Sequence, residues 1–421
     1  MITTTVTHWD VIVIGAGPGG LMAAITAAAQ GCRVLVLEKN DQPGRKLLAT
    51  GGGQCNLTHQ MPMKSFLVHY HEKAAYAGKC IRQFSPESLM QWFSQRGVRL
   101  EVLENGKVFP ASRRATEILE VLLKEMKELK VVMNCRSPVK KLETFKEGFQ
   151  VTCGEEVNKA NTVILSTGGF TYPSLGTAGD GYRLAADLGH RIVTPRPALT
   201  GLTVKHWKLE DLSGVSLQEI TISHWSGGRK AGTYTGDLLF THQGVSGPVI
   251  LNYSRYFKLG DLLTVNLATP EKEEAFSSRM LRELQSVGKK KVKTLLYKEP
   301  VPRRVIDSVM RMAGINDDQV CASVTKDQRK MLVKWMTRMP LEVEVLGDVE
   351  TAMVTTGGVS TDEIRSSTME SLIVPGLFLV GEVQDVDGMT GGFNLQFAFS
   401  SGYVAGRSAV SRQKEGGSKC R

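Results

Sequence analysis

The sequence predicts an α/β fold in which both ends of the chain build one domain and the middle builds a second, β-rich domain. Three observations indicate this. Residues 9–38 follow the order strand, glycine-rich turn, helix, strand. Residues 377–381 form another apolar strand near the C-terminus. Between them lie short alternating runs typical of antiparallel strands, at residues 217–223 and 262–268.

The first element is a strand that runs directly into a glycine-rich turn. Residues 9–14 are a short β-branched run, which is typical of a buried strand. The next six residues read G-x-G-x-x-G and open an Ala-rich helix over residues 21–30. Gly15 allows a tight turn, Gly17 lets the backbone approach a pyrophosphate, and Gly20 lets the helix pack closely on the strand. The free N–H groups of the helix N-terminus favour an anion there.

A second strand follows at the spacing that a dinucleotide site requires. Residues 33–37 are apolar and end at Glu38, 18 residues after Gly20. At this position a carboxylate can accept a hydrogen bond from the ribose of an adenosine. Strand, turn, helix, strand and acid in this order predict a Rossmann-like dinucleotide-binding domain.

Three consecutive glycines, Gly51–Gly53, come shortly after this unit. Each glycine costs backbone entropy, so turn chemistry alone does not account for three in a row. We interpret the run as chain that passes close to a flat or phosphorylated ligand.

Several ordered segments between residues 11 and 406 resemble those of one flavoprotein family. They read P-G-R-K-x-x-x-T-G-G-G-Q-C-N at 43–56, F-P-A-S at 109–112, T-G-G at 167–169 followed by G-D-G-Y at 179–182, L-F-T-H-Q-G-V-S-G-P at 239–248, T-G-G-V at 356–359 with T-M-E-S at 368–371, and G-L-F-L-V-G-E at 376–382 with G-G-F-N-L-Q at 391–396. The chain resembles the BaiN-like, or aminoacetone-oxidase-type, FAD-binding flavoproteins, a family of NAD(P)- and FAD-dependent oxidoreductases. Gln54 stands where that family usually has Arg.

The resemblance implies FAD as the cofactor, with NAD(P)H as a transient co-substrate. It also implies that the helix beginning near Asn394 points its N-terminus at the flavin, where it would stabilise an anionic reduced ring. Glu382 is expected on the ribityl hydroxyls. Motif and resemblance together place the following residues at the cofactor: Gly15, Ala16, Gly17, Pro18, Gly19, Gly20, Glu38, Lys39, Arg45, Lys46, Gly52, Gly53, Cys55, Asn56, Val139, Thr167, Gly168, Gly169, Asp180, Gly381, Glu382, Gly392, Phe393, Asn394 and Leu395.

The order of the strands along the chain predicts the domain boundaries. The dinucleotide strands lie near the N-terminus and a closing strand lies near residue 380, so the FAD-binding domain should comprise residues 1–194 and 350–421. A β-barrel-like insert is expected at 195–269 and 339–349. Within it, residues 270–338 have helical spacing and should form a small cap.

The positive charge of the chain is concentrated in that helical cap. The whole chain carries a formal charge of +10, and residues 271–338 contain 16 Lys and Arg against 9 Asp and Glu. A basic surface can attract nucleic acid or another anionic partner, although charge runs are more often simply solvated. Lys289–Lys293 together with Arg303 and Arg304 are the strongest candidates for an RNA contact.

Other classes of protein are not indicated. No apolar run is long enough to span a membrane, and residues 1–10 lack the pattern of a secretory signal, so a cytoplasmic protein without a membrane partner is expected. The seven Cys include no C-x-x-C pair, and no cluster has metal-ligand spacing, so no metal is expected. The sequence does not indicate an oligomeric state.

Catalytic residues are not determined by the motifs. His242, Cys55 and Tyr172 are candidates because they lie in family segments and carry titratable groups. Asp385 and Asp387 are also acidic candidates, although a glycine-rich loop uses Asp for turns as well. Cys55 lacks a second Cys within three residues, which favours packing over a disulfide relay.

The sequence therefore predicts an FAD-dependent oxidoreductase that moves hydride or electrons between flavin and a small organic substrate. Members of the resembled family range from amine oxidases to reductases of unsaturated steroid ketones, which leaves the direction open. A flavin-dependent protein that modifies or binds RNA through the basic cap is the alternative. A flavin-binding protein without catalysis is a third possibility.

Overall fold

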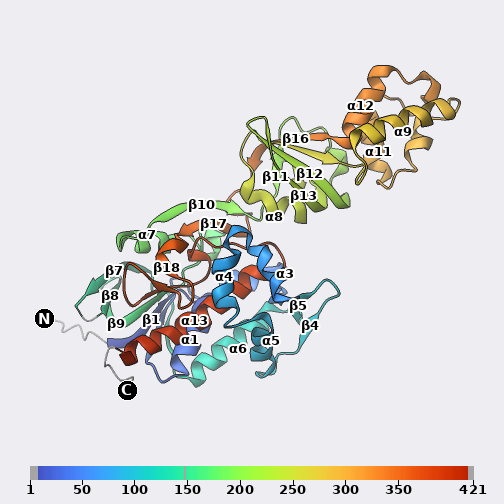
Figure 1. The fold of residues 1–421 in the computed structure, drawn as a ribbon. Helices are drawn as coiled ribbons and strands as arrows, with labels where there is room; N and C mark the ends of the chain where they lie inside the picture. Colours follow the sequence, from blue (N-terminus) through green and yellow to red (C-terminus); the bar gives the residue numbers. More distant parts are fainter. Residues whose placement is uncertain (1–7, 147, 416–421) are drawn as a thin grey trace. The chain divides into compact units, whose positions relative to one another are not determined.

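The chain folds into two compact units. The computed structural model describes residues 8–146 and 148–415 (Figure 1). One unit comprises the chain up to Pro197 and again from Val349 onward, and the other comprises Ala198–Asp348. These divisions lie three residues and one residue from the expected boundaries at 194/195 and 349/350. The first unit is therefore built from both ends of the chain.

A central sheet with a parallel core organises the first unit. Its strands lie in the order β18-β19-β20-β9-β1-β2-β6, and β8 and β7 extend it from β9. The pairs β1–β2, β1–β9, β2–β6 and β9–β20 are parallel. The bounds are β1 His8–Ile14, β2 Val34–Leu37, β6 Val132–Asn134, β7 Val139–Phe145, β8 Gly148–Cys153, β9 Glu156–Leu165, β18 Ile364–Arg365, β19 Glu370–Ser371 and β20 Leu377–Leu379.

The central strands of this sheet are buried on both faces, which explains the uninterrupted apolar runs at the end of β1 and in β2 and β20. Val11 and Val13 point into the core shared with α1 (Pro18–Ala28) and α13 (Phe393–Glu415). Ile12 and Ile14 point into a second core on the opposite face. Side chains alternate along a strand, so each strand contributes to both cores.

The first and last of these helices, α1 and α13, pack against each other almost at backbone contact (Figure 1). A Cβ atom added to Gly402 would lie 2.2 Å from the carbonyl oxygen of Gly19. One added to Gly406 would lie 2.5 Å from the carbonyl oxygen of Ala23. The small residues of both helices therefore bring the two ends of the chain together.

Helices and short strands complete the first unit. A three-stranded sheet of β3, β5 and β4 and a pair of β10 and β17 lie apart from the central sheet. The bounds are α2 Arg45–Ala49, β3 Thr58–His59, α3 Met63–Leu67, α4 Ala74–Ile81, α5 Pro86–Ser94, β4 Leu100–Val102, β5 Lys107–Pro110, α6 Ala115–Glu128, α7 Asp180–Asp187, β10 Ile192–Ala198 and β17 Val354–Val359.

The second unit contains a closed barrel, which confirms the predicted β-barrel-like insert. Its strands follow the order β11-β14-β13-β12-β15-β16. The predicted strands at 217–223 and 262–268 correspond to β12 and β15. The bounds are β11 Leu202–Val204, β12 Ser216–Ser226, β13 Arg229–Phe240, β14 Gly244–Ser246, α8 Pro248–Tyr253, β15 Leu262–Asn266 and β16 Met339–Leu346.

Four helices between β15 and β16 form the helical subdomain. They are α9 Glu273–Ser286, α10 Val292–Leu296, α11 Arg303–Met312 and α12 Lys326–Thr337. Phe276, Val309 and Met336 are fully buried and belong to the same core as the barrel interior. Of the helices in the described ranges, none is both long and apolar enough to cross a membrane.

We expect Gly402→Ala to destabilise the protein. The added methyl group would meet the Gly19 backbone, and overpacking of this kind costs about 1–3 kcal/mol, more than the ~1 kcal/mol that alanine gains in a helix. Urea unfolding measures the free-energy change. Ser411→Ala, at an exposed position of the same helix, is the control and should change stability by less than ~0.5 kcal/mol. A Gly402→Ala protein as stable as the parent would contradict this packing.

Candidate cofactor and active site

The glycine-rich turn has the geometry of a phosphate-binding loop. A Cβ atom on Gly15 would lie 2.6 Å from the carbonyl oxygen of Ser166, and one on Gly20 would lie 2.1 Å from the carbonyl oxygen of Gly15. Both positions need glycine for packing. Gly17 differs, since nothing lies within 4 Å of its Cβ position. Its backbone therefore faces open space at the N-terminus of α1, where a pyrophosphate group can approach.

This open space belongs to a cavity of about 390 Å³. Seventeen of the residues that the sequence places at the cofactor line it. They are Gly15, Ala16, Gly17, Pro18, Gly19, Glu38, Lys39, Arg45, Lys46, Val139, Thr167, Gly168, Asp180, Gly381, Glu382, Asn394 and Leu395. The other eight lie outside the lining: Gly20, Gly52, Gly53, Cys55, Asn56, Gly169, Gly392 and Phe393.

Polar groups around the cavity suit an adenine dinucleotide. The Glu38 carboxylate is held at the end of β2 because Oε2 accepts a hydrogen bond from the Ala16 N–H at 2.8 Å. Lys39 forms an ion pair with Asp180. The hydroxyl of Thr167 is buried and has no hydrogen-bond partner in the described part of the chain. This oxygen lies against Gly181, whose Cβ position is 1.9 Å from it, so protein atoms and not the open cavity surround the hydroxyl.

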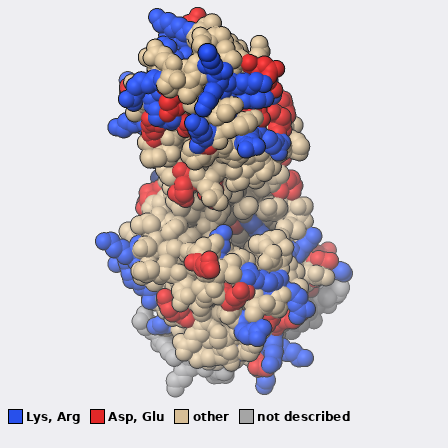
Figure 2. All heavy atoms as spheres, turned by 90° about the vertical axis from the view of Figure 1, so that its right-hand side faces the viewer, with Lys and Arg blue, Asp and Glu red and all other residues tan. Residues whose placement is uncertain are grey.

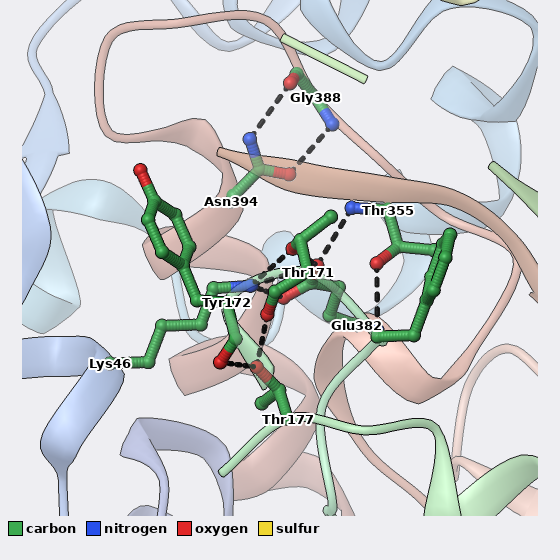
Figure 3. Close-up of polar contacts among 9 residues, drawn as sticks. Lys46, Thr171, Tyr172, Thr177, Thr355, Glu382, Gly388 and Asn394 are labelled. Carbon is green, nitrogen blue, oxygen red and sulfur yellow. Dashed lines mark hydrogen bonds and ion pairs between the residues drawn. The ribbon is translucent and has the colours of Figure 1, made fainter. Parts of the chain in front are cut away.

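An ion pair connects two distant segments at this cavity (Figure 3). Lys46 Nζ lies 2.8 Å from Glu382 Oε2 and donates to the Thr171 hydroxyl at 2.9 Å. The other carboxylate oxygen of Glu382 accepts from the Thr355 N–H at 2.8 Å. Thr171 and Thr355 are not in the predicted set, and no motif distinguishes them. Only the fold shows that they hold Glu382.

The C-terminal loop is closed onto the start of α13 by one side chain. The Asn394 amide accepts from the Gly388 N–H and donates to the Gly388 carbonyl, both at 2.8 Å (Figure 3). Asn394 and Leu395 line the cavity beside the N-terminus of a 23-residue helix. The positive end of the helix dipole therefore lies at the cavity wall.

Phe393 supports the site from behind. It is 2% exposed, and its ring stacks on His69 at 4.1 Å between centroids. His59 packs on it at 5.4 Å. The aromatic side chain thus fixes the start of α13 without lining the cavity.

The three glycines at 51–53 have a local explanation. Their φ angles are +58°, +64° and +87°, a left-handed backbone that favours glycine. None of them lines the cavity. The left-handed turn by itself therefore accounts for three consecutive glycines, and a ligand close to this run is not required to explain them.

The catalytic candidates lie in different places. Cys55 is buried and desolvation raises the pKa of its thiol to about 12, so it carries almost no thiolate at neutral pH. His242 is exposed in the second unit. Asp385 pairs with Lys73 at 2.8 Å. Tyr172 is half-buried, has a left-handed backbone (φ +57°) and lies with its ring 5.9 Å from the Nζ of Lys46, a residue of the cavity lining (Figure 3).

No group of three or more His, Cys, Asp or Glu side chains that could hold a metal ion occurs within residues 8–146 and 148–415.

Comparison with known proteins identifies the family. Residues 9–408 match the model of the HI0933-like protein Rossmann domain. The chain belongs to the HI0933-like family. A ribosomal RNA dihydrouridine synthase of Haemophilus influenzae is 32% identical over 409 residues, which cover 96% of this chain and 98% of the relative. A 3-dehydro-bile acid delta(4,6)-reductase of Clostridium scindens is 30% identical over 414 residues, 95% of this chain and 98% of the relative. A ribosomal RNA dihydrouridine synthase of Escherichia coli is 28% identical over 406 residues, 96% and 98% of the two chains.

Solved structures share the fold of this HI0933-like protein at low identity. A 3-ketosteroid-delta4-(5alpha)-dehydrogenase of Rhodococcus jostii has a TM-score of 0.51 at 16% identity and covers 97% of this chain and 98% of its own. A quinol-fumarate reductase has a TM-score of 0.53 at 15% identity, and the match covers 98% of this chain and 72% of the reductase chain. Family and fold together show a Rossmann-type flavoprotein that binds FAD and belongs to the FAD-dependent oxidoreductases. None of the relatives described here is named as an aminoacetone oxidase.

We expect Gly17→Ala to weaken FAD binding without destabilising the protein. The methyl group would meet no protein atom and would project into the cavity where the pyrophosphate approaches. The Kd for FAD, measured by flavin fluorescence on apoprotein, should rise at least about tenfold, or ~1.4 kcal/mol. Gly201→Ala in the second unit is the control and should leave the Kd unchanged. Unchanged FAD affinity in Gly17→Ala would show that the phosphates bind elsewhere.

His59 should make stability depend on pH. Burial, with smaller contributions from His69 and Lys107, lowers the pKa of its imidazole from 6.5 to about 4. Between pH 4 and pH 6.5, the His59 imidazole is therefore mostly protonated in the unfolded chain and mostly neutral in the folded chain. The stabilisation is complete above pH 6.5 and is lost as the pH falls toward 4.

The loss attributable to His59 between pH 7 and pH 4.5 is about 2 kcal/mol. Urea unfolding of His59→Gln should show a correspondingly smaller loss over this interval, whereas the exposed His206→Gln control should follow the parent. Identical pH profiles for the parent and His59→Gln would refute the assignment.

Proposed function

We propose that this protein reduces a carbon–carbon double bond conjugated to a carbonyl group, with FAD as the redox cofactor and NAD(P)H as the electron donor. The observation that carries the proposal is the chemistry shared by relatives that match nearly the whole chain. Dihydrouridine differs from uridine by reduction of the C5=C6 bond, which is conjugated to the C4 carbonyl. The delta-4,6 bonds of a 3-dehydro-bile acid are conjugated to its 3-keto group.

The residues around the cavity support this chemistry. Bound FAD supplies hydride chemistry, and the protein supplies binding, orientation and electrostatics. The Lys46–Glu382 pair and the Thr355 N–H fix the C-terminal loop, and the N-terminus of α13 presents positive potential to a cofactor that gains negative charge on reduction. The ring of Tyr172 lies 5.9 Å from Lys46 Nζ, and we assign its hydroxyl, at the far end of that ring in Figure 3, as the source of the proton that must accompany hydride addition.

NAD(P)H would bind transiently. The sequence contains no second G-x-G-x-x-G unit with its strand and helix, so a separate nicotinamide domain of the disulfide-reductase type is not part of the proposal. A donor that approaches the flavin from the substrate side requires no such domain.

Anaerobic stopped-flow absorbance tests the proposal. NADH or NADPH should bleach the flavin band near ~450 nm, and an enone, a 3-keto-4,6-diene steroid or a uridine-containing RNA should restore it. Tyr172→Phe should slow the restoring step at least about tenfold and leave the bleaching rate unchanged, because only the restoring step needs the proton. Tyr403→Phe, on the far part of α13, is the control.

Two results would contradict the proposal. One is a flavin that no nicotinamide nucleotide reduces but that amines reduce, which would identify an amine oxidase. The other is a flavin reduced by NAD(P)H and reoxidised by none of the conjugated acceptors.

A further inference from the structure

The helical subdomain carries the charge excess of the chain, and some of its cations form internal ion pairs. Lys and Arg side chains gather over this part of the molecule in Figure 2. Arg279 binds Glu271 and Glu299, at 2.8 Å and 2.7 Å. Arg311 binds Asp211 at 3.0 Å. Such cations stabilise the subdomain and are already neutralised.

The cluster that the sequence suggested for RNA is partly neutralised as well. Lys291 pairs with Asp318 at 2.5 Å, and Lys293 lies 4.0 Å from Asp317. Arg304 donates to the backbone carbonyl of Asp211. Lys289 and Lys290 remain exposed, and no acidic partner binds them in the described part of the chain.

Helix α12 presents a row of cations outside the cluster of Lys289–Lys293, Arg303 and Arg304. Lys326, Lys330 and Lys334 are exposed and are spaced four residues apart, so they follow one side of the helix at steps of about 6 Å. Their ammonium groups have no acidic partner among the described residues. The opposite side of the helix, which includes Leu332 and Met336, is buried. Asp327 is the single acid of α12.

Backbone hydrogen bonds join this row to Lys289 and Lys290. The Cys321 N–H donates to the Lys290 carbonyl and the Ala322 N–H to the Gly288 carbonyl, both at 2.9 Å. Three residues after Ala322, the Thr325 side chain caps α12 in a reciprocal pair with Gln328. We call the five lysines Lys289, Lys290, Lys326, Lys330 and Lys334 the α12 face.

We propose that the α12 face binds the phosphate backbone of RNA, and that the substrate of this enzyme is a uridine in that RNA. The inference rests on the proposed function, since it selects between the two kinds of conjugated acceptor. A row of unpaired ammonium groups at regular spacing complements a polymer with one negative charge per nucleotide. A steroid has no comparable row of negative charges that these lysines could bind. Lysine contacts to phosphate are independent of base sequence, so the site at the flavin would choose the base.

The experiment compares RNA binding by three full-length, FAD-loaded proteins. A fluorescein-labelled stem-loop RNA of about 30 nucleotides is titrated in a series of salt concentrations, and the Kd is read from anisotropy. The test variant is Lys326→Gln/Lys330→Gln/Lys334→Gln. The matched control, Lys79→Gln/Lys127→Gln/Lys130→Gln, removes the same formal charge from exposed positions of the FAD-binding unit. Melting temperature and visible flavin spectrum verify that both variants are folded.

For the parent we expect log K to fall with log salt at a slope of about −3.5 to −4.5, as five phosphate contacts require. In the test variant the slope should weaken by about 2 to 3, and the affinity near 0.1 M salt should fall at least about tenfold. The control should remain within about twofold of the parent.

Three results would overturn the proposal. They are no measurable RNA binding by the parent, equal losses in test variant and control, and binding through the α12 face to phosphatidylserine vesicles but not to RNA. The stopped-flow experiment is independent of these outcomes. If conjugated acceptors reoxidise the flavin but the parent protein does not bind RNA, the proposed function stands and the RNA-binding role of the α12 face is wrong. If the α12 face binds RNA but no conjugated bond is reduced, the RNA-binding role stands and the proposed function is wrong.

Discussion

The contact between α1 and α13 is the constraint on which the rest of the first unit depends. The Gly402 and Gly406 positions leave room for the backbone of α1, so the first and last helices lie closer than ordinary side chains would permit. This contact places the phosphate turn after β1 and the glycine-rich loop after β20 on the same cavity, although more than 350 residues separate them. A chain with larger residues at this seam would hold its two halves of the cofactor site apart.

The site is therefore a joint product of both chain ends. Gly17 contributes an open backbone, and Glu38 is positioned by the Ala16 N–H. Glu382 comes from the other end and is held by Lys46 and Thr355. The Lys46–Glu382 pair acts as a cross-link between the ends of the chain, and each partner is about one-fifth exposed. Such a pair is expected to orient the loop more than to add net stability, because burial of charge offsets much of the attraction.

The insert serves a different physical purpose. Its barrel and helices share one hydrophobic core, which makes the insert a single compact unit. Internal ion pairs neutralise some of the cations of this unit, such as Arg279 and Arg311, whereas the lysines of the α12 face have no acidic partner among the described residues. The two proposals thus assign redox chemistry and recognition of a polyanion to separate units of one chain.

The sequence by itself determined the elements whose signals are local. Spacing over a few residues predicts the turn at Gly15–Gly20, the strand just before Glu38 and a helix from about Asn394, which the structure begins at Phe393. The family motifs identified the cofactor. Tertiary structure decided which side chains meet. Thr171 and Thr355 bind Glu382 through contacts between distant segments, Phe393 packs behind the cavity, and Lys291 is neutralised by Asp318 while Lys330 is not. Pairing and burial depend on positions in space that a linear pattern does not contain. The roles of the charge clusters and of the glycine run could therefore be determined only from the tertiary structure.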